Sequence, residues 1–344
     1  MEREIYLDNS ATTRVCDEAA QKALELMTRE YGNPSSLHTM GLRAEQAMSA
    51  ARRSIAGMLG AEEKNITFTS GGTESNNLAL FGAAYALRRR GNRIVTTAVE
   101  HHSVLYAAQQ LEKEGFEVIY LQPDESGNIP PQAIFDAVNS KTILVSMMAV
   151  NNETGAIFPV ETAAAAIRRA KAPALLHVDA VQAFGKLPLR PAKMGVDLMS
   201  ISGHKVHAPK GIGAFGAAVD AMPPIHEETA AVRALNLRLR EELACMDGVH
   251  IHSPEDGLPY ILNFSAGKVR AETMLHFLAQ RGIYVSSGSA CAKAARSHVL
   301  SAMGLPAAEI DSSLRVSFSR YNTEADVAAL AAALKEGLQT LAHA

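Results

Sequence analysis

Short apolar runs alternate with longer segments of helical period over the first two thirds of the chain. The apolar runs predict strands at residues 66–69, 93–97, 118–121, 142–147, 174–178, 198–201 and 213–215. The segments between them predict helices at residues 74–90, 103–115, 131–138 and 160–170. Strands that alternate with helices in this way are typical of an α/β domain with a mostly parallel, doubly wound sheet.

The pattern changes near His226, where long helices and shorter apolar runs no longer alternate regularly. The later part predicts helices at 229–244, at 272–280 and from Thr323 onward, with strands at 260–264, 283–286 and 314–318. This mixture is typical of a smaller α+β domain. We therefore expect a large α/β domain over residues 15–225, and a small α+β domain formed by residues 1–14 and 226–344.

Composition narrows the class of protein. The chain is 47% hydrophobic and 20% charged with a net charge of −3, which is typical of a soluble globular protein without a nucleic-acid footprint. Neither the N-terminus nor any later stretch has the apolar length of a signal peptide or a membrane span. The three cysteines, Cys16, Cys245 and Cys291, are widely spaced, match no disulfide framework or zinc pattern, and indicate a reducing cytoplasm.

The strongest candidate for chemistry is Lys205, which ends the run Ser202-Gly203-His204-Lys205 just after a predicted strand. A lysine whose neighbours lower its pKa can act as a neutral amine and form a Schiff base. A solvated lysine at a strand end is the alternative. Asp179 ends the preceding strand, and Gly72-Thr73 opens a predicted helix that can bind an anion. An amine, an acid and a phosphate cradle are the parts of a pyridoxal phosphate site.

Three further polar residues follow predicted strands. His101 can stack on a planar cofactor and carry a proton, or it can be a structural histidine. Asn152 can hydrogen-bond a cofactor or substrate, or it can form an Asx turn. Gln182, three residues after Asp179, can reach the phenolic oxygen of the cofactor.

A thiol and a guanidinium complete the set of candidates. Cys291 lies in a run of small residues, where Lys293 and Arg296 favour the thiolate, whereas Cys16 and Cys245 look structural. Arg315 lies inside a predicted strand, where it needs either an anionic partner, such as a substrate carboxylate, or an edge position that faces water.

The chain resembles the cysteine desulfurases, fold type I pyridoxal-phosphate enzymes of the class V aminotransferase superfamily. The resemblance is carried by motifs spread over nearly the whole sequence: residues 6–13, 32–38, 69–74, 100–103, 151–155, 179–182, 202–205 and 286–291. The last of these, Ser-Ser-Gly-Ser-Ala-Cys, resembles the subgroup that serves iron–sulfur cluster assembly and tRNA thiolation.

The resemblance implies how the cofactor is held. Lys205 forms the Schiff base and moves protons, Asp179 pairs with the pyridine nitrogen, and Gln182 contacts the phenolic oxygen. His101 stacks on the ring as a catalytic residue. The residues implied in phosphate binding are Gly72, Thr73, Ser202 and His204.

The resemblance also implies the reaction and its partners. The carboxylate of L-cysteine is held by Arg315 and Asn152. Asn152 also contacts the cofactor. Cys291 attacks the sulfur of the bound substrate, which leaves a persulfide on the enzyme and alanine as product. A homodimer and a sulfur-acceptor protein, either a scaffold or a tRNA-thiolation enzyme, are expected as partners. A selenocysteine lyase-like enzyme and a degenerate member without turnover are the alternatives.

One departure from the family follows the strand predicted at 213–215. Family members continue into a basic, glycine-rich segment whose Ser-Gly-Thr-x-Asn threonine reaches the cofactor phosphate of the neighbouring subunit. Here Phe215 runs directly into Gly216. We expect the chain to be interrupted between these two residues and the complete protein to be longer. An intact peptide bond would instead predict an under-coordinated phosphate and a weakly held cofactor.

Overall fold

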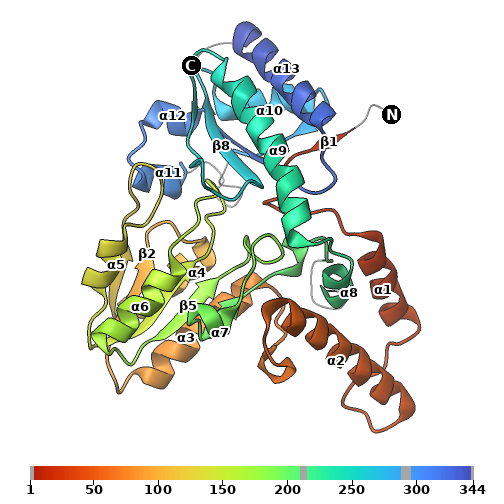
Figure 1. The fold of residues 1–344 in the computed structure, drawn as a ribbon, viewed down its shortest axis with the longest axis vertical. Helices are drawn as coiled ribbons and strands as arrows, with labels where there is room; N and C mark the ends of the chain where they lie inside the picture. The colour runs from red at the N-terminus through yellow and green to blue at the C-terminus, as the bar shows by residue number, and fades with distance from the viewer. Residues whose placement is uncertain (1–3, 210–214, 288–295, 342–344) are drawn as a thin grey trace.

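The computed structural model describes residues 4–209, 215–287 and 296–341. Within these ranges the chain forms two main sheets (Figure 1). A parallel sheet has five strands in the order β3-β2-β4-β5-β6, and an antiparallel sheet has three in the order β10-β8-β7. The expected α/β fold with a mostly parallel large sheet and a smaller α+β part is confirmed.

The parallel sheet has helices between its strands, as the alternating pattern predicts. Its strands are β2 (Arg93–Thr97), β3 (Glu117–Leu121), β4 (Thr142–Met148), β5 (Leu175–Asp179) and β6 (Leu198–Ser200). The connecting helices are α3 (Gly72–Leu87), α4 (His102–Lys113), α5 (Pro131–Ala137), α6 (Val160–Ala170) and α7 (Pro191–Met194). All seven residues of β4 are buried, which a central strand covered by helices on both faces requires.

The strand order predicts where a ligand-binding crevice lies on the parallel sheet. From β2 the chain moves outward to β3 and then returns to the other side of β2 with β4, so the order reverses between β2 and β4. In open parallel sheets, ligands bind beyond the carboxyl ends of the strands at such a reversal. The loops that follow β2 and β4 begin the motifs that contain His101 and Asn152.

The antiparallel sheet lies at the other end of the molecule, near both described chain ends (Figure 1). Its strands are β7 (Val249–Ile251), β8 (Ile261–Ala266) and β10 (Ser313–Ser317), and β1 (Ile5–Tyr6) pairs separately with β9 (Ile283–Tyr284). The accompanying helices are α9 (Ile225–Ala244), α10 (Ala271–Ala279), α11 (His298–Ala302), α12 (Ala307–Asp311) and α13 (Glu324–Thr340). Thr323 caps α13 in a capping box with Asp326, as the predicted helix start requires.

Two predicted strands are wrong. Residues 66–69 follow a short 3-10 helix, η1 (Glu63–Asn65), and pair with no strand in the described chain. Phe215 is helical rather than extended, since it begins α8 (Phe215–Asp220), and positions 213 and 214 lie outside the described residues. Sequence analysis also missed α1 (Asp17–Thr28) and α2 (Thr39–Leu59), which extend to one side of the parallel sheet (Figure 1).

The expected interruption between Phe215 and Gly216 is also wrong, because both residues belong to the continuous helix α8. Gly216 explains how this short helix fits. A Cβ at position 216 would lie 2.7 Å from the Cα of Ala51 on α2, so glycine lets the two helices approach closely. The direct step from Phe215 to Gly216 is therefore part of the fold.

The core is continuous between the two sheets. A cluster of buried apolar side chains includes Val145 of β4, Phe264 of β8 and Leu330 of α13. The described helices include none that is both long and apolar enough to cross a membrane.

Candidate active site

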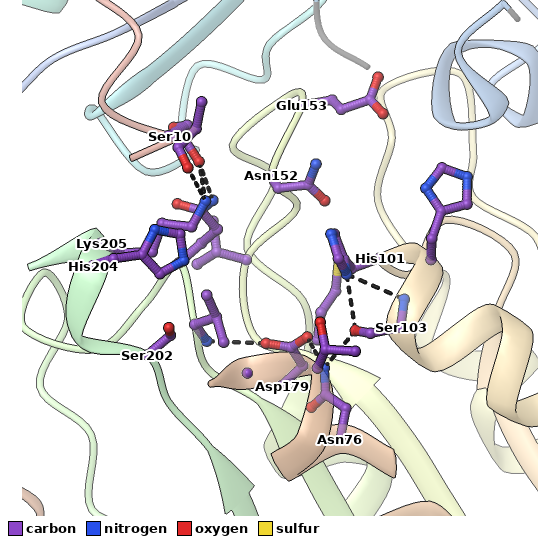
Figure 2. A pocket seen from close by; sticks show the side chains of 18 of the residues that line it. Ser10, Asn76, His101, Ser103, Asn152, Glu153, Asp179, Ser202, His204 and Lys205 are labelled. Carbon is purple, nitrogen blue, oxygen red and sulfur yellow. Dashed lines mark hydrogen bonds between the residues drawn. The ribbon is translucent and has the colours of Figure 1, made fainter. Parts of the chain in front are cut away.

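A cavity of about 310 Å³ lies beyond the carboxyl ends of the parallel strands, a size typical of small-molecule sites. It brings together every candidate site residue from the sequence analysis that lies in the described chain. These are Gly72, Thr73, His101, Asn152, Asp179, Gln182, Ser202, His204, Lys205 and Arg315. Figure 2 shows Lys205 on one side of the cavity, His101 on the other, and Asp179 between them at its floor.

Lys205 ends a short 3-10 helix, η2 (Gly203–Lys205), that follows β6. Its Nζ donates hydrogen bonds to the carbonyl oxygens of Ser10 and of Ala11, the latter at 2.9 Å (Figure 2). The amine is thus directed across the cavity rather than into bulk water, which excludes the alternative of a solvated lysine at a strand end.

Asp179 is the last residue of β5 and is buried. One carboxyl oxygen accepts the Val181 N–H at 3.0 Å, and the other accepts Nδ2 of Asn76 at 2.7 Å. Burial raises the pKa of Asp179, while these two hydrogen bonds and the nearby His101 and Lys205 lower it. A carboxylate can accept about four hydrogen bonds, so capacity remains for a protonated ring nitrogen.

His101 precedes α4 and caps it. Its Nδ1 accepts the backbone N–H of Ser103 at 3.2 Å and lies 2.8 Å from the Ser103 hydroxyl. Burial lowers the pKa of His101, and the nearby Lys205, His102 and His298 lower it further. Asp179 has the opposite effect and raises this pKa. The ring is therefore neutral at physiological pH.

The expected phosphate cradle lies at the N-terminus of α3, where backbone N–H groups lack partners within the helix. A Cβ on Gly72 would lie 3.0 Å from Cγ2 of Val181, so a side chain there would crowd the cavity wall. Gly72, Thr73, Ser202 and His204 also line a second cavity of about 520 Å³, so they form the wall that the two cavities share.

Gln182 and Asn76 each leave a buried oxygen that faces no partner in the described residues. Nε2 of Gln182 donates to the carbonyl of Ser10 at 3.0 Å, which leaves its Oε1 unpaired. An unpaired buried oxygen is costly, and both side chains line the cavity. These oxygens are therefore positioned for a ligand.

Arg315 lies on β10 and only 2% of its surface is exposed, which excludes the alternative of an edge arginine that faces water. Its guanidinium donates to Asp8 at 2.9 Å and to the Asn152 carbonyl at 3.0 Å. The Arg315 backbone pairs with Ser286 across an isolated bridge. The anion that a buried arginine needs is therefore supplied by the chain, and a substrate carboxylate would join this pair.

A rim of polar residues that sequence analysis missed lies beside Arg315. Nε2 of His298 donates to the Glu100 carbonyl at 3.0 Å, and its ring centre lies 4.8 Å from that of His102. The Ser297 hydroxyl donates to the carboxylate of Glu153, which also lines the cavity. No local signal in the sequence marks these partners, because they are about 140 to 200 residues apart.

Asn76 was also missed, although a signal for it exists. It lies four residues after Gly72, so the two share a face of α3 and both reach the cavity. A polar asparagine on the same face of an otherwise apolar helix is the sequence signal that indicates a position in the site.

Two of the three cysteines lie in the described residues. Cys291 lies outside the described residues. Cys16 is buried, as a structural cysteine should be, but Cys245 is exposed at the end of α9, so its interpretation as structural is wrong.

The residues around the cavity fit pyridoxal phosphate. A lysine amine, a buried acid, a neutral imidazole and a helix N-terminus converge on one space, which is also lined by Gln182 and Asn76, each with a buried oxygen that has no partner in the described residues. No cluster of metal-binding side chains occurs in the described parts of the chain.

Known proteins resemble this chain along most of its length. The Aminotransferase class-V family matches residues 5–227 and 214–330. "Cysteine desulfurase IscS" from Methanosarcina thermophila is 37% identical, covering 98% of this chain and 93% of its own length. The protein of the same name from Serratia proteamaculans (strain 568) is 40% identical, covering 95% and 91%. A solved "NIFS-LIKE PROTEIN" superposes with a TM-score of 0.92 at 34% identity, over 98% of this chain and 100% of its own.

Two features of these matches bear on the departure after Phe215. The two parts of the family match overlap at residues 214–227, which include Phe215. The match to the Methanosarcina protein extends over 377 positions, which exceeds the 344 residues of this chain, so that relative has residues without counterparts here. By sequence and by fold, the chain belongs to the aminotransferase class-V family, among its cysteine desulfurases.

Proposed function

We propose that the protein is a cysteine desulfurase that converts L-cysteine to L-alanine with pyridoxal phosphate as cofactor. The observation that carries this function is the convergence of Lys205, Asp179 and His101 on one cavity with the buried Arg315 at its edge. The sulfur passes to Cys291: one C–S bond breaks, one S–S bond forms, and a thiol plus cysteine gives a persulfide plus alanine. No external oxidant or reductant is needed for that balance.

Each part of the cofactor has a matching residue. Lys205 would hold its aldehyde carbon covalently, Asp179 its ring nitrogen and Gln182 its phenolic oxygen, with His101 against the ring. Its phosphate would lie among Gly72, Thr73, Ser202 and His204. When bound, pyridoxal phosphate supplies an electron sink that stabilises negative charge at the carbon beside the amino group.

The chain's own residues supply binding and proton transfer. Arg315 and Asn152 orient the substrate carboxylate, and Asp8 and the Asn152 carbonyl hold the guanidinium in place. Lys205 would move protons at the substrate carbon, since its amine lies in the cavity, where the carbonyls of Ser10 and Ala11 orient it. The names of the relatives support this substrate: a solved structure 29% identical over 93% of this chain is named "SspA in complex with cysteine".

Incubation of purified protein with pyridoxal phosphate, L-cysteine and a thiol reductant tests the function. We expect equal amounts of alanine and sulfide, and neither product from the Lys205→Ala variant. Absence of both products from the unaltered protein, with the cofactor bound, would refute the proposed function. Competition between cysteine and selenocysteine distinguishes a desulfurase from a selenocysteine lyase-like enzyme.

A second candidate is a degenerate member that binds the cofactor without turnover. The observation in its favour is that the two parts of the family match overlap at residues 214–227, where the sequence lacks the basic, glycine-rich segment of the family. Retained visible absorption after dialysis without any sulfide release would support it. Rapid loss of the cofactor on dialysis, with activity restored by added pyridoxal phosphate, would instead indicate an active but weakly binding enzyme.

Several finer properties belong to the same proposal. We propose a cytoplasmic homodimer that passes sulfur to a scaffold or tRNA-thiolation protein, with domains at 15–225 and at 1–14 plus 226–344. Exposed apolar side chains around α1 and α2 support the dimer: Leu24, Met27, Tyr31, Leu37 and Leu42. Light scattering coupled to gel filtration measures the oligomeric state directly.

A further inference from the structure

A row of hydrogen bonds joins His101 to Asp179 beneath the cavity. The Ser103 hydroxyl lies 2.8 Å from Nδ1 of His101 and accepts Nδ2 of Asn76 at 2.9 Å. The same Nδ2 donates to the Asp179 carboxylate at 2.7 Å. Ser103, Asn76 and Asp179 are all buried, so water does not compete for these bonds (Figure 2).

The direction of these bonds follows from their donors. The backbone N–H of Ser103 can only donate, and it points at Nδ1 of His101 at 3.2 Å, so Nδ1 must be an acceptor without a proton. The Ser103 oxygen already accepts from Asn76, which leaves its hydroxyl hydrogen for the same Nδ1. A neutral His101 therefore carries its proton on Nε2.

The Nε2 side of the ring faces the ligand space. His101 lines the cavity, and its Nε2 makes no hydrogen bond to another residue within the described ranges. An N–H at this position can donate a hydrogen bond to a ligand, but it cannot accept a proton. Protonation would have to occur at Nδ1, where two donors already point.

We propose that Ser103 and Asn76 are positioning residues that fix His101 in the Nε2–H tautomer, so that the imidazole offers the cavity a donor rather than a base. Only the consequence for catalysis rests on the proposed function: if His101 cannot act as a base, Lys205 must remove the proton from the substrate. The tautomer itself does not depend on turnover.

The charged groups around His101 fit this assignment. Lys205 faces it across the cavity, His102 follows it on α4, and His298 approaches from α11, and each opposes a positive ring. Asp179 is the one neighbour among these groups that favours a positive ring. Asn76 lies between Asp179 and the Ser103 hydroxyl. Its hydrogen bond to the Asp179 carboxylate offsets part of the effect by which that carboxylate favours a positive His101.

The tautomer can be observed directly. Protein labelled with 15N-histidine and loaded with pyridoxal phosphate is examined by two-dimensional NMR, and the His101→Gln variant identifies the His101 signals. We expect a protonated Nε2 and an unprotonated Nδ1 from about pH 6 to about pH 8, the range in which an ordinary histidine titrates. A proton on Nδ1, or a doubly protonated ring near neutral pH, would overturn the proposal.

Variants separate positioning from general structural support. Ser103→Ala removes one donor to Nδ1, so the pKa of His101 should rise by roughly one unit, the value of one lost hydrogen bond. Ser103→Thr keeps the hydroxyl and should restore the original pKa. An unchanged pKa in Ser103→Ala would remove Ser103 from this role.

Asn76 and its neighbour provide a matched pair. Asn77 lies on the exposed side of α3 and donates to the Thr73 carbonyl, so Asn77→Ala should leave the His101 signals unchanged. Asn76→Ala should shift them, and it gives the same test if Ser103→Ala fails to fold. Signals that respond equally to both alanine variants would contradict the proposal. The desulfurase assay is scored separately, so loss of the proposed function and loss of the tautomer are distinguishable.

Discussion

The two sides of the cavity are built in different ways. The inner wall consists of His101, Asp179 and Lys205, which lie at the carboxyl ends of β2, β5 and β6 of one parallel sheet. The rim, Arg315, Ser297 and His298, comes from β10 and the region of α11, and its contacts join residues far apart in the chain. The wall is fixed by one sheet, whereas the rim depends on how the two sheets pack together.

The two regions also differ in charge. In the inner wall, burial lowers the pKa of His101, whereas the pKa of Asp179 is raised by burial and lowered by its hydrogen bonds from Val181 and Asn76. At the rim, Arg315 forms an ion pair with Asp8 at 2.9 Å. A buried wall with one acid and one neutral imidazole suits a planar aromatic cofactor with a protonated ring nitrogen, and an arginine at the rim suits the carboxylate of an amino acid. We therefore expect that cofactor binding and substrate binding can be changed separately.

The largest expected effect comes from the inner wall. Lys205→Ala removes the amine that would hold the cofactor, so the visible absorption of the bound cofactor and all alanine formation should disappear. Absorption spectra and an alanine assay measure both. A variant with an unaltered spectrum and rate would assign the cofactor lysine elsewhere.

The next effect belongs to the proposed sulfur acceptor. Cys291→Ser should retain the cofactor and still change its visible spectrum on addition of cysteine, but form no persulfide, because an alcohol cannot replace the nucleophilic thiolate. Cys245→Ser is the control, since Cys245 is exposed and lies outside the cavity lining. Mass spectrometry detects the persulfide. Full activity in Cys291→Ser would direct attention to Cys245.

A smaller effect is expected at the rim. Arg315→Lys keeps the charge but loses the planar fork, so the KM for cysteine should rise by about ten- to a hundred-fold, the range of a lost charged hydrogen bond. Bound cofactor, measured by absorption, should be unchanged. Asp8→Asn should give a weaker effect of the same kind, because the guanidinium loses its ionic anchor. Loss of cofactor from Arg315→Lys would contradict separate control of wall and rim.

The smallest effect on activity is expected behind the wall, at Glu100. Its carboxyl accepts bonds from Thr97 and from the Met148 N–H, and burial raises its pKa to about 8. The folded protein keeps this proton up to about pH 8, whereas the unfolded chain releases it above the ordinary glutamate pKa of 4.5. Stability should therefore fall as pH rises through this range, by on the order of a few kcal/mol.

Glu100→Gln removes the titrating group and should flatten that dependence. Urea unfolding at several pH values compares the two proteins. The pKa of His177 is shifted in the opposite direction, since burial lowers it to about 3, so the contribution of this residue to stability falls as pH drops below 6.5. His177 is present in both proteins and serves as an internal reference. An identical slope in the two proteins between pH 4.5 and about 8 would show that Glu100 is ionised in the folded state.

From the amino-acid sequence alone, the fold class, the five strands of the parallel sheet and ten of the residues that line the cavity could be predicted. These features follow from local patterns: apolar runs of strand length, helical periods, and polar residues placed directly after strands. Parallel strands end at a common edge, so residues such as Asp179 and Lys205 could be brought together in advance. The errors, at residues 66–69 and at Phe215, fall at short segments where a few apolar residues fit a strand, a turn or a helix equally well.

The tertiary structure decided which groups pair and which stay neutral. Asn76 with Asp179, Arg315 with Asp8, and His298 with the Glu100 carbonyl join residues that no local pattern relates. The neutral state of His101 depends on burial and on the nearby Lys205, His102 and His298, all of which lower the pKa of its imidazole. Hydrogen bonding and desolvation act over a few ångströms, and only the folded chain brings distant residues that close.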